Sequence, residues 1–71
     1  MMRDIDAEFL HRMFLEKDTD VLVVVKGTIM EKAGDNMVEQ GYLTKTENES
    51  GTHFGFQLTK MAKTLLDFKE L

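Results

Sequence analysis

The sequence predicts a small α+β domain in which helices pack against a β-hairpin. Apolar residues recur at helical spacing in three stretches of the chain, which predicts three amphipathic helices. Two stretches rich in strand-forming residues, 42–47 and 53–58, flank a turn-forming segment that contains Gly51, which predicts the hairpin. No repeat or linker interrupts the 71 residues, so we expect a single domain over residues 1–71.

The first helix is expected over residues 4–17. Asp6 and Glu8 lie in its first turn, where the helix dipole favours negative charge. Its apolar side chains recur every three or four residues and form one stripe. The stripe comprises Ile5, Phe9, Leu10, Met13 and Phe14. The helix should end before residues 18–20, because all three are of types that cap helices or form turns.

Two conformations are open to residues 21–25, Val-Leu-Val-Val-Val. Four valines favour a strand, because each costs roughly 0.5 kcal/mol relative to Ala in a helix. Residues 18–20 can cap a helix, however, and Lys26-Gly27 can end one, which slightly favours a short helix over about residues 20–26. As a strand, the segment would instead add a third member to the hairpin.

A longer helix is expected over residues 28–40, with Thr28 as its N-cap and Gly41 as a left-handed C-terminal cap. At 100° per residue, one half of this helix is apolar and the other half is polar. The apolar half comprises Ile29, Met30, Ala33, Gly34, Met37 and Val38. The polar half comprises Glu31, Lys32, Asp35, Asn36 and Glu39. Because Gly34 lacks a side chain, we expect a neighbouring helix to approach it closely.

The hairpin is expected over residues 42–47 and 53–58, and the last helix over residues 59–70, with Thr59 as its N-cap. The last helix should pack through Ala62, Leu65, Leu66 and Phe68.

Five residues mark the two ends of the hairpin: Gly41, Tyr42, Leu43, Leu58 and Thr59. This pattern resembles the winged-helix superfamily, in particular small bacterial and phage winged-helix proteins and the cores of MarR- and PadR-type regulators. The likeness covers about residues 18–66. It implies that residues 28–40 form a recognition helix, that residues 44–56 form the wing, and that the protein is a regulator. It also implies a homodimer through the terminal helices, to which Phe68 and Leu71 would contribute apolar contacts.

The charge of the chain disfavours DNA as the main partner. Nine Lys and Arg stand against 13 Asp and Glu, which gives a net charge of −4, whereas phosphate-binding proteins usually show a basic excess or a basic face. Glu31, Asp35 and Glu39 follow one another at i, i+4 and i+8 along the polar half of the helix, where they would repel phosphates. The simplest interpretation of these acids is a solvated face.

The functional hypothesis is a regulatory binding module whose partner is a protein with a basic surface. Its predicted contact residues are Glu31, Asp35, Asn36 and Glu39. The alternative, implied by the resemblance, is a dimeric DNA-binding regulator. Its predicted contact residues are Lys32, Asn36, Gln40, Lys45, Lys60 and Lys63.

No arrangement of residues predicts catalysis, a metal site or a cofactor. The chain has no cysteine, and His11 and His53 have no further ligand at metal-binding spacing. Ser50 is the only serine, and no glycine-rich phosphate loop is present. We therefore expect a protein that is not an enzyme. The absence of cysteine, of a signal peptide and of an apolar run of about 18 residues predicts a cytoplasmic protein that does not enter a membrane.

Overall fold

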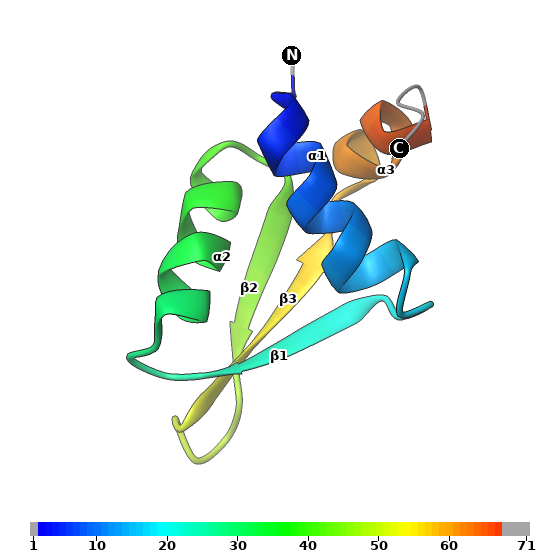
Figure 1. Ribbon diagram of the computed structural model, residues 1–71. Helices are drawn as coiled ribbons and strands as arrows, with labels where there is room; N and C mark the ends of the chain where they lie inside the picture. Colours follow the sequence, from blue (N-terminus) through cyan, green and yellow to red (C-terminus); the bar gives the residue numbers. More distant parts are fainter. Residues whose placement is uncertain (1, 68–71) are drawn as a thin grey trace.

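The computed structural model describes residues 2–67, which form a three-stranded antiparallel sheet with helices packed on one of its faces (Figure 1). In chain order the elements are α1 (Asp4–Leu10), the π-helical segment η1 (His11–Leu15), β1 (Val21–Val25), α2 (Ile29–Glu39), β2 (Leu43–Glu47), β3 (His53–Leu58) and α3 (Lys60–Asp67). The strand order is β1-β3-β2, so that β3 is central and β1 and β2 are the two edges. The protein is a small α+β domain, consistent with a winged-helix-like arrangement.

The first helix extends through α1 and η1, close to the predicted range of 4–17. In η1 the helix widens, because the amide of Glu16 donates to the carbonyl of His11 at 2.8 Å, five residues earlier. The buried line of this helix runs through Ala7, Leu10 and Phe14, which are fully buried. The prediction that Ile5 faces the core is wrong: it is 70% exposed, because it lies about half a turn away from Ala7.

Residues 21–25 form a strand in the structure. The prediction of a short helix over about residues 20–26 is therefore wrong. Asp18 has a φ of 50°, which ends the preceding helix. Val21–Val25 then pairs antiparallel with β3, with Val23 opposite Gly55. The strand is stabilised by pairing with β3, which lies more than 25 residues further along the chain. Local propensity alone therefore could not decide the conformation of residues 21–25. As a result, the element before α2 is a strand.

The predicted ends of α2 are confirmed. The hydroxyl of Thr28 accepts from the amide of Glu31 at 3.4 Å. At the other end Gly41 has a φ of 85°, its amide donates to Val38 at 2.9 Å, and the amide of Tyr42 donates to Met37 at 2.9 Å. These two bonds form a Schellman motif, which satisfies carbonyls that the helix itself cannot bond.

The apolar half of α2 differs from the prediction at two positions. Ile29, predicted to be buried, is 85% exposed, because it lies about 140° around the helix from the buried Gly34. Gly34 is buried, but its neighbour is the ring of Phe56 on β3 and not another helix: a Cβ atom built on Gly34 would overlap that ring. The missing side chain therefore lets α2 lie directly on the sheet.

The hairpin and the start of the last helix lie where the sequence predicts them, and residues 68–70 of the helix predicted over 59–70 lie outside the described residues. Asn48 holds the loop, since its Oδ1 accepts from the amides of Thr52 at 2.9 Å and His53 at 3.1 Å. Thr59 caps α3, with its hydroxyl accepting from the amide of Ala62 at 3.1 Å. Phe68 and Leu71, the predicted dimer contacts, lie outside the described residues.

The core lies between the helices and one face of the sheet. Phe56 at the centre of β3 is fully buried, and it is surrounded by apolar side chains from the helices and from both edge strands. The buried apolar residues are Met2, Ala7, Leu10, Phe14, Val24, Met37, Tyr42, Leu43, Phe56, Ala62 and Leu66.

Candidate protein-binding site

The acidic residues predicted to bind a partner are partly used within the fold. The ammonium group of Lys45, on β2, lies 2.9 Å from Oε2 of Glu31 and 2.6 Å from Oδ1 of Asp35. The same ammonium lies 3.9 Å from the centre of the Phe54 ring, within the range of a cation–π interaction. We call Lys45, Glu31 and Asp35 the Lys45 triad. The triad links α2 to the edge strand β2.

The protonation of the triad follows from its hydrogen bonds. The amide of Gly27 donates to Oε1 of Glu31 at 2.6 Å, and this bond, together with that from Lys45, lowers the pKa of Glu31. The hydrogen bonds to Asp35 and Glu31 raise the pKa of Lys45. The lowered pKa of Glu31 and the raised pKa of Lys45 keep both of these groups charged near neutral pH.

Two predicted contact residues of the acidic face remain exposed, Asn36 and Glu39. The Oδ1 of Asn36 accepts from the side-chain amide of Gln40 at 3.3 Å, one helical turn further along. Because Glu31 and Asp35 already bind Lys45, a basic partner would have to compete with an internal cation at two of the three acids.

The residues predicted for DNA binding also fall into two groups: some are bonded within the fold and others are exposed. Lys45 is half-buried and bound to two carboxylates, so it cannot reach a phosphate without breaking the triad. Lys32 on α2 and Lys60 and Lys63 on α3 are exposed. Gln40 is half-buried and bonded to Asn36. The structure therefore leaves three exposed lysines of the predicted set, none of which lies on the wing.

The second face of the sheet is open. Side chains alternate along β1, so that Val24 packs in the core while Val21, Val23 and Val25 point to the opposite face, where they are 39%, 63% and 52% exposed. We call this surface the open face. Its remaining residues come from the neighbouring strands: Thr44, Thr46, His53, Gly55 and Gln57.

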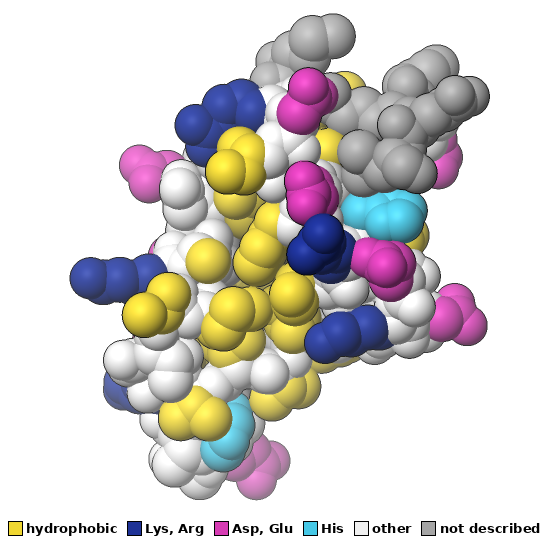
Figure 2. All heavy atoms as spheres, in the orientation of Figure 1, with side chains coloured by type: hydrophobic (Ala, Val, Ile, Leu, Met, Phe, Trp, Pro, Cys, Tyr) yellow, Lys and Arg dark blue, Asp and Glu magenta, His cyan; other side chains and the backbone are white. Residues whose placement is uncertain are grey.

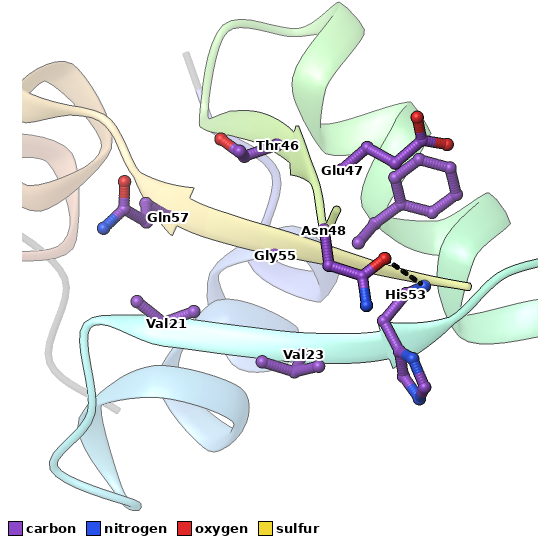
Figure 3. Close-up of a pocket in the computed structure, with 9 residues that line it drawn as sticks. Val21, Val23, Thr46, Glu47, Asn48, His53, Gly55 and Gln57 are labelled. Carbon is purple, nitrogen blue, oxygen red and sulfur yellow. Dashed lines mark hydrogen bonds between the residues drawn. The ribbon is translucent and has the colours of Figure 1, made fainter. Parts of the chain in front are cut away.

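A hollow of about 610 Å³ lies on the open face (Figure 3). Val21 and Val23 of β1 border it on one side and Thr46 of β2 on the other, with Gly55 of β3 between them. Gly55 contributes no side chain, and a Cβ atom at this position would meet only Val21 Cγ1 at 3.6 Å and the Thr46 carbonyl at 3.9 Å. The hollow is therefore lined mainly by apolar groups and is wide enough to accept side chains of a partner.

The outer edge of β1 carries backbone groups without a neighbouring strand. The amide of Lys26 donates to the carbonyl of Thr52 at 3.0 Å, which continues the β1–β3 ladder. Because the backbone direction alternates along an antiparallel strand, Leu22, Val24 and Lys26 bond to β3, whereas Val21, Val23 and Val25 turn their amides and carbonyls outward.

Threonine side chains cover the two ends of this edge. The Thr19 hydroxyl lies 3.3 Å from the amide and 3.1 Å from the carbonyl of Val21. The Thr28 hydroxyl donates to the carbonyl of Val25 at 2.7 Å. Within residues 2–67, no such side chain covers the amide and carbonyl of Val23, so the middle of the edge is free.

On the helical side of the same edge, the cover of the core is incomplete. Figure 2 shows hydrophobic side chains gathered in the middle of this face, over the sheet between α1 and α2. A groove of about 430 Å³ follows β1 there. Its apolar lining includes Met13, Leu22, Val24 and Met30. The edge of β1 is therefore apolar on both of its faces.

The sequence contains a signal for this surface. In the strand conformation, five consecutive apolar residues place apolar side chains on both faces, and only one face can pack on the helices of so small a domain. In the helical interpretation of residues 21–25 the same residues predict no such surface.

The remaining candidates for chemistry belong to the loop or stand alone. The Ser50 hydroxyl lies 2.9 Å from that of Thr52, which lies 2.8 Å from Nδ1 of His53, so these groups join the network around Asn48. Among residues 2–67, no group of three or more His, Cys, Asp or Glu side chains is placed to hold a metal ion. In that same range, no helix is long and apolar enough to cross a membrane.

Comparison of the chain with protein families, with curated proteins and with solved structures finds no match. The likeness to winged-helix proteins therefore remains a prediction, which rests on the residues at the two ends of the hairpin.

Proposed function

We propose that this chain is a non-enzymatic binding module of the cytoplasm, with a regulatory role, and that its partner is a protein that packs an apolar surface on the open face. One observation carries the proposal: Val21, Val23 and Val25 stand side by side on an uncovered sheet. Fully burying a valine is worth about 1.5–3 kcal/mol, so a partner that covers this row gains a substantial part of its binding free energy there.

The shape of the open face favours an amphipathic segment as the partner surface. The hollow beside Gly55 interrupts the row of side chains, and a partner residue inserted there would contact Val21, Val23 and Thr46. An apolar anchor in a pocket surrounded by polar groups is the usual form of a binding hot spot. The polar groups here are those of Glu47, Asn48 and Gln57.

The acidic face of α2 ranks second as a contact surface. Glu39 and Asn36 are exposed and could meet a basic partner, but Glu31 and Asp35 are bound to Lys45. The contribution of the acidic residues to binding is thus reduced to Glu39 and to the exposed part of Asp35.

A photo-crosslinking experiment tests the proposal and separates the two surfaces. A benzophenone amino acid is placed at Val23 in one variant and at Glu39 in a matched variant, since both positions are exposed. Each variant is irradiated in the cells that make the protein, and adducts are identified by mass spectrometry. We expect an adduct with a second protein from position 23. No such adduct at position 23, or one only from position 39, would overturn the assignment to the open face.

DNA binding is the alternative that the winged-helix resemblance implies. Lys32, Lys60 and Lys63 would have to provide its phosphate contacts, against a net charge of −4. A fluorescence titration with duplex DNA at about 50 mM salt tests it, because phosphate contacts are strongest at low salt. Binding that is lost when Lys60 and Lys63 are replaced by Gln would establish the alternative.

A further inference from the structure

We infer that the free edge of β1 pairs with β1 of a second copy of this chain, antiparallel, about a two-fold axis at Val23. The inference goes beyond the proposed function, because edge pairing uses backbone groups that a partner on the open face does not contact. It joins two three-stranded sheets into one continuous sheet of six strands.

The hydrogen-bonding groups of the edge are arranged for such a pair. Val23 turns its amide and its carbonyl outward, and a two-fold axis at this residue places them against the same groups of the second copy. Val21 then lies opposite Val25 of the second copy, where two further bonds form on each side when the Val21 amide exchanges its 3.3 Å bond to the Thr19 hydroxyl for the Val25 carbonyl. The carbonyls of Val21 and Val25 each accept from a threonine hydroxyl and still have a second lone pair.

The side chains identify a second copy as the occupant. With the axis at Val23, every apolar residue of β1 lies opposite an apolar residue: Val21 opposite Val25, and Leu22 opposite Val24. The same register places Asp20 of each copy opposite Lys26 of the other, so that opposite charges meet at both ends of the paired strands. Both residues are exposed in the single chain, and Lys26 would exchange its 3.8 Å contact with Glu47 of its own chain for Asp20 of the second copy.

Other registers lack this match. An axis at Val21 would place Val23 opposite Thr19 and Asp20 opposite Leu22 of the second copy. An axis at Val25 would place Val23 opposite Gly27 and Lys26 opposite Val24. Strand register is set by the apolar pattern, and only the axis at Val23 places an apolar residue opposite each of the five residues of β1.

Pairing also covers the groove on the helical side of β1. Leu22 and Val24 of the second copy would lie next to Leu22 and Val24 of the first, at the mouth of the groove lined by Met13 and Met30. On the opposite side, the two rows of valines would join into one apolar surface, larger than either chain presents alone. The dimer therefore enlarges the open face and does not block it.

A single cysteine at the axis tests the geometry directly, because the chain has no other cysteine. Facing residues of a hydrogen-bonded antiparallel pair have Cα atoms about 5.5 Å apart, which is within the range that a disulfide spans. We expect Val23→Cys to form a covalent dimer under mild oxidation. The matched control is Thr44→Cys, on the same face but on the other edge strand, and it should stay monomeric.

Sedimentation equilibrium of the unmodified chain should give twice the mass of one 8.2 kDa chain, with a concentration-dependent dissociation. Asp20→Lys should weaken the dimer about tenfold, because both charge pairs become repulsive. The double variant Asp20→Lys with Lys26→Glu should restore it. Asp20 is chosen for the single change because Lys26 also lies 3.8 Å from Glu47 of its own chain.

Three results would overturn the inference: a monomer at all concentrations, equal crosslinking of the two cysteine variants, or a double variant that dimerises no better than Asp20→Lys. The outcome is separable from that of the proposed function. A monomer that still gives an adduct with another protein from position 23 refutes the dimer alone. A dimer whose position 23 reacts only with its own copy refutes the proposed partner alone.

Discussion

The two edge strands of the sheet differ in what lies beside them. In the middle of β2, the side chain of Lys45 points toward α2 and binds Glu31 and Asp35, and Glu47 follows at the end of the strand. β1 carries no charged residue, proline or glycine over Val21–Val25. Natural sheets protect their edges from unwanted pairing with charges, prolines, bulges or a covering element. β2 has such protection and β1 lacks it over Val21–Val25, and the proposed pairing of β1 rests on this contrast.

The two faces of the sheet differ in the same way, as two glycines show. Gly34 lies on the buried side of α2 against the Phe56 ring, where a Cβ atom has no room. Gly55 lies on the open face, where a Cβ atom would make only ordinary contacts. One side of the sheet is thus closely packed within the chain, and the other leaves room for a second molecule. Substitutions on the two sides should therefore differ in their effect on stability.

A large effect is expected from Gly34→Ala. Alanine gains about 1 kcal/mol of helix propensity over glycine, but its methyl group must displace a fully buried ring, and overpacking of this kind typically costs about 1–3 kcal/mol. We expect a net loss of stability, measured as a lower urea midpoint. Gly55→Ala is the matched control and should be neutral or stabilise the fold. If Gly34→Ala proved as stable as the control, the close packing of α2 on Phe56 would be disproved.

A smaller loss of stability is expected from Lys45→Met, which leaves Glu31 and Asp35 without their cation. The loss should be moderate, because the groups are partly exposed and water screens them. Lys32→Met serves as the control, because Lys32 is exposed on α2, the helix that carries Glu31 and Asp35, and forms no ion pair within residues 2–67.

The effect of Lys45→Met should depend on pH. The pKa of Glu31 is lowered from 4.5 in the folded chain. The contribution of Glu31 to the free energy of unfolding is therefore fully present above pH 4.5 and is lost as the pH falls through the lower folded-state pKa. The pKa of Lys45 is raised from 10.5 in the folded chain. The contribution of Lys45 to the free energy of unfolding is therefore fully present below pH 10.5 and is lost as the pH rises through the higher folded-state pKa. Urea midpoints of the variant and the unmodified chain should therefore approach each other as the pH falls below the folded-state pKa of Glu31. A constant difference from pH 7 downward would show that packing, and not charge, dominates at Lys45.

The helix ends could be predicted from the sequence because their causes are local. Thr28, Gly41 and Thr59 each satisfy backbone groups within a few residues, and all three cap the helices predicted for them. The ion pairs of Lys45 could not be predicted, since its partners lie 14 and 10 residues away and meet it only once β2 lies beside α2. The strand conformation of β1 likewise depends on β3, which follows it by a whole helix and a strand.

The smallest effect is expected at the open edge itself. Val23→Thr keeps a β-branched side chain on an exposed position, so the free energy of unfolding of the single chain should change by less than about 0.5 kcal/mol. The same substitution at Val24, one residue further and packed in the core, buries a hydroxyl group and should cost about 1–3 kcal/mol. Urea unfolding at a protein concentration too low for association measures both. Equal costs at the two positions would show that the side chain of Val23 is packed within its own chain, and the distinction between the two edges would no longer hold.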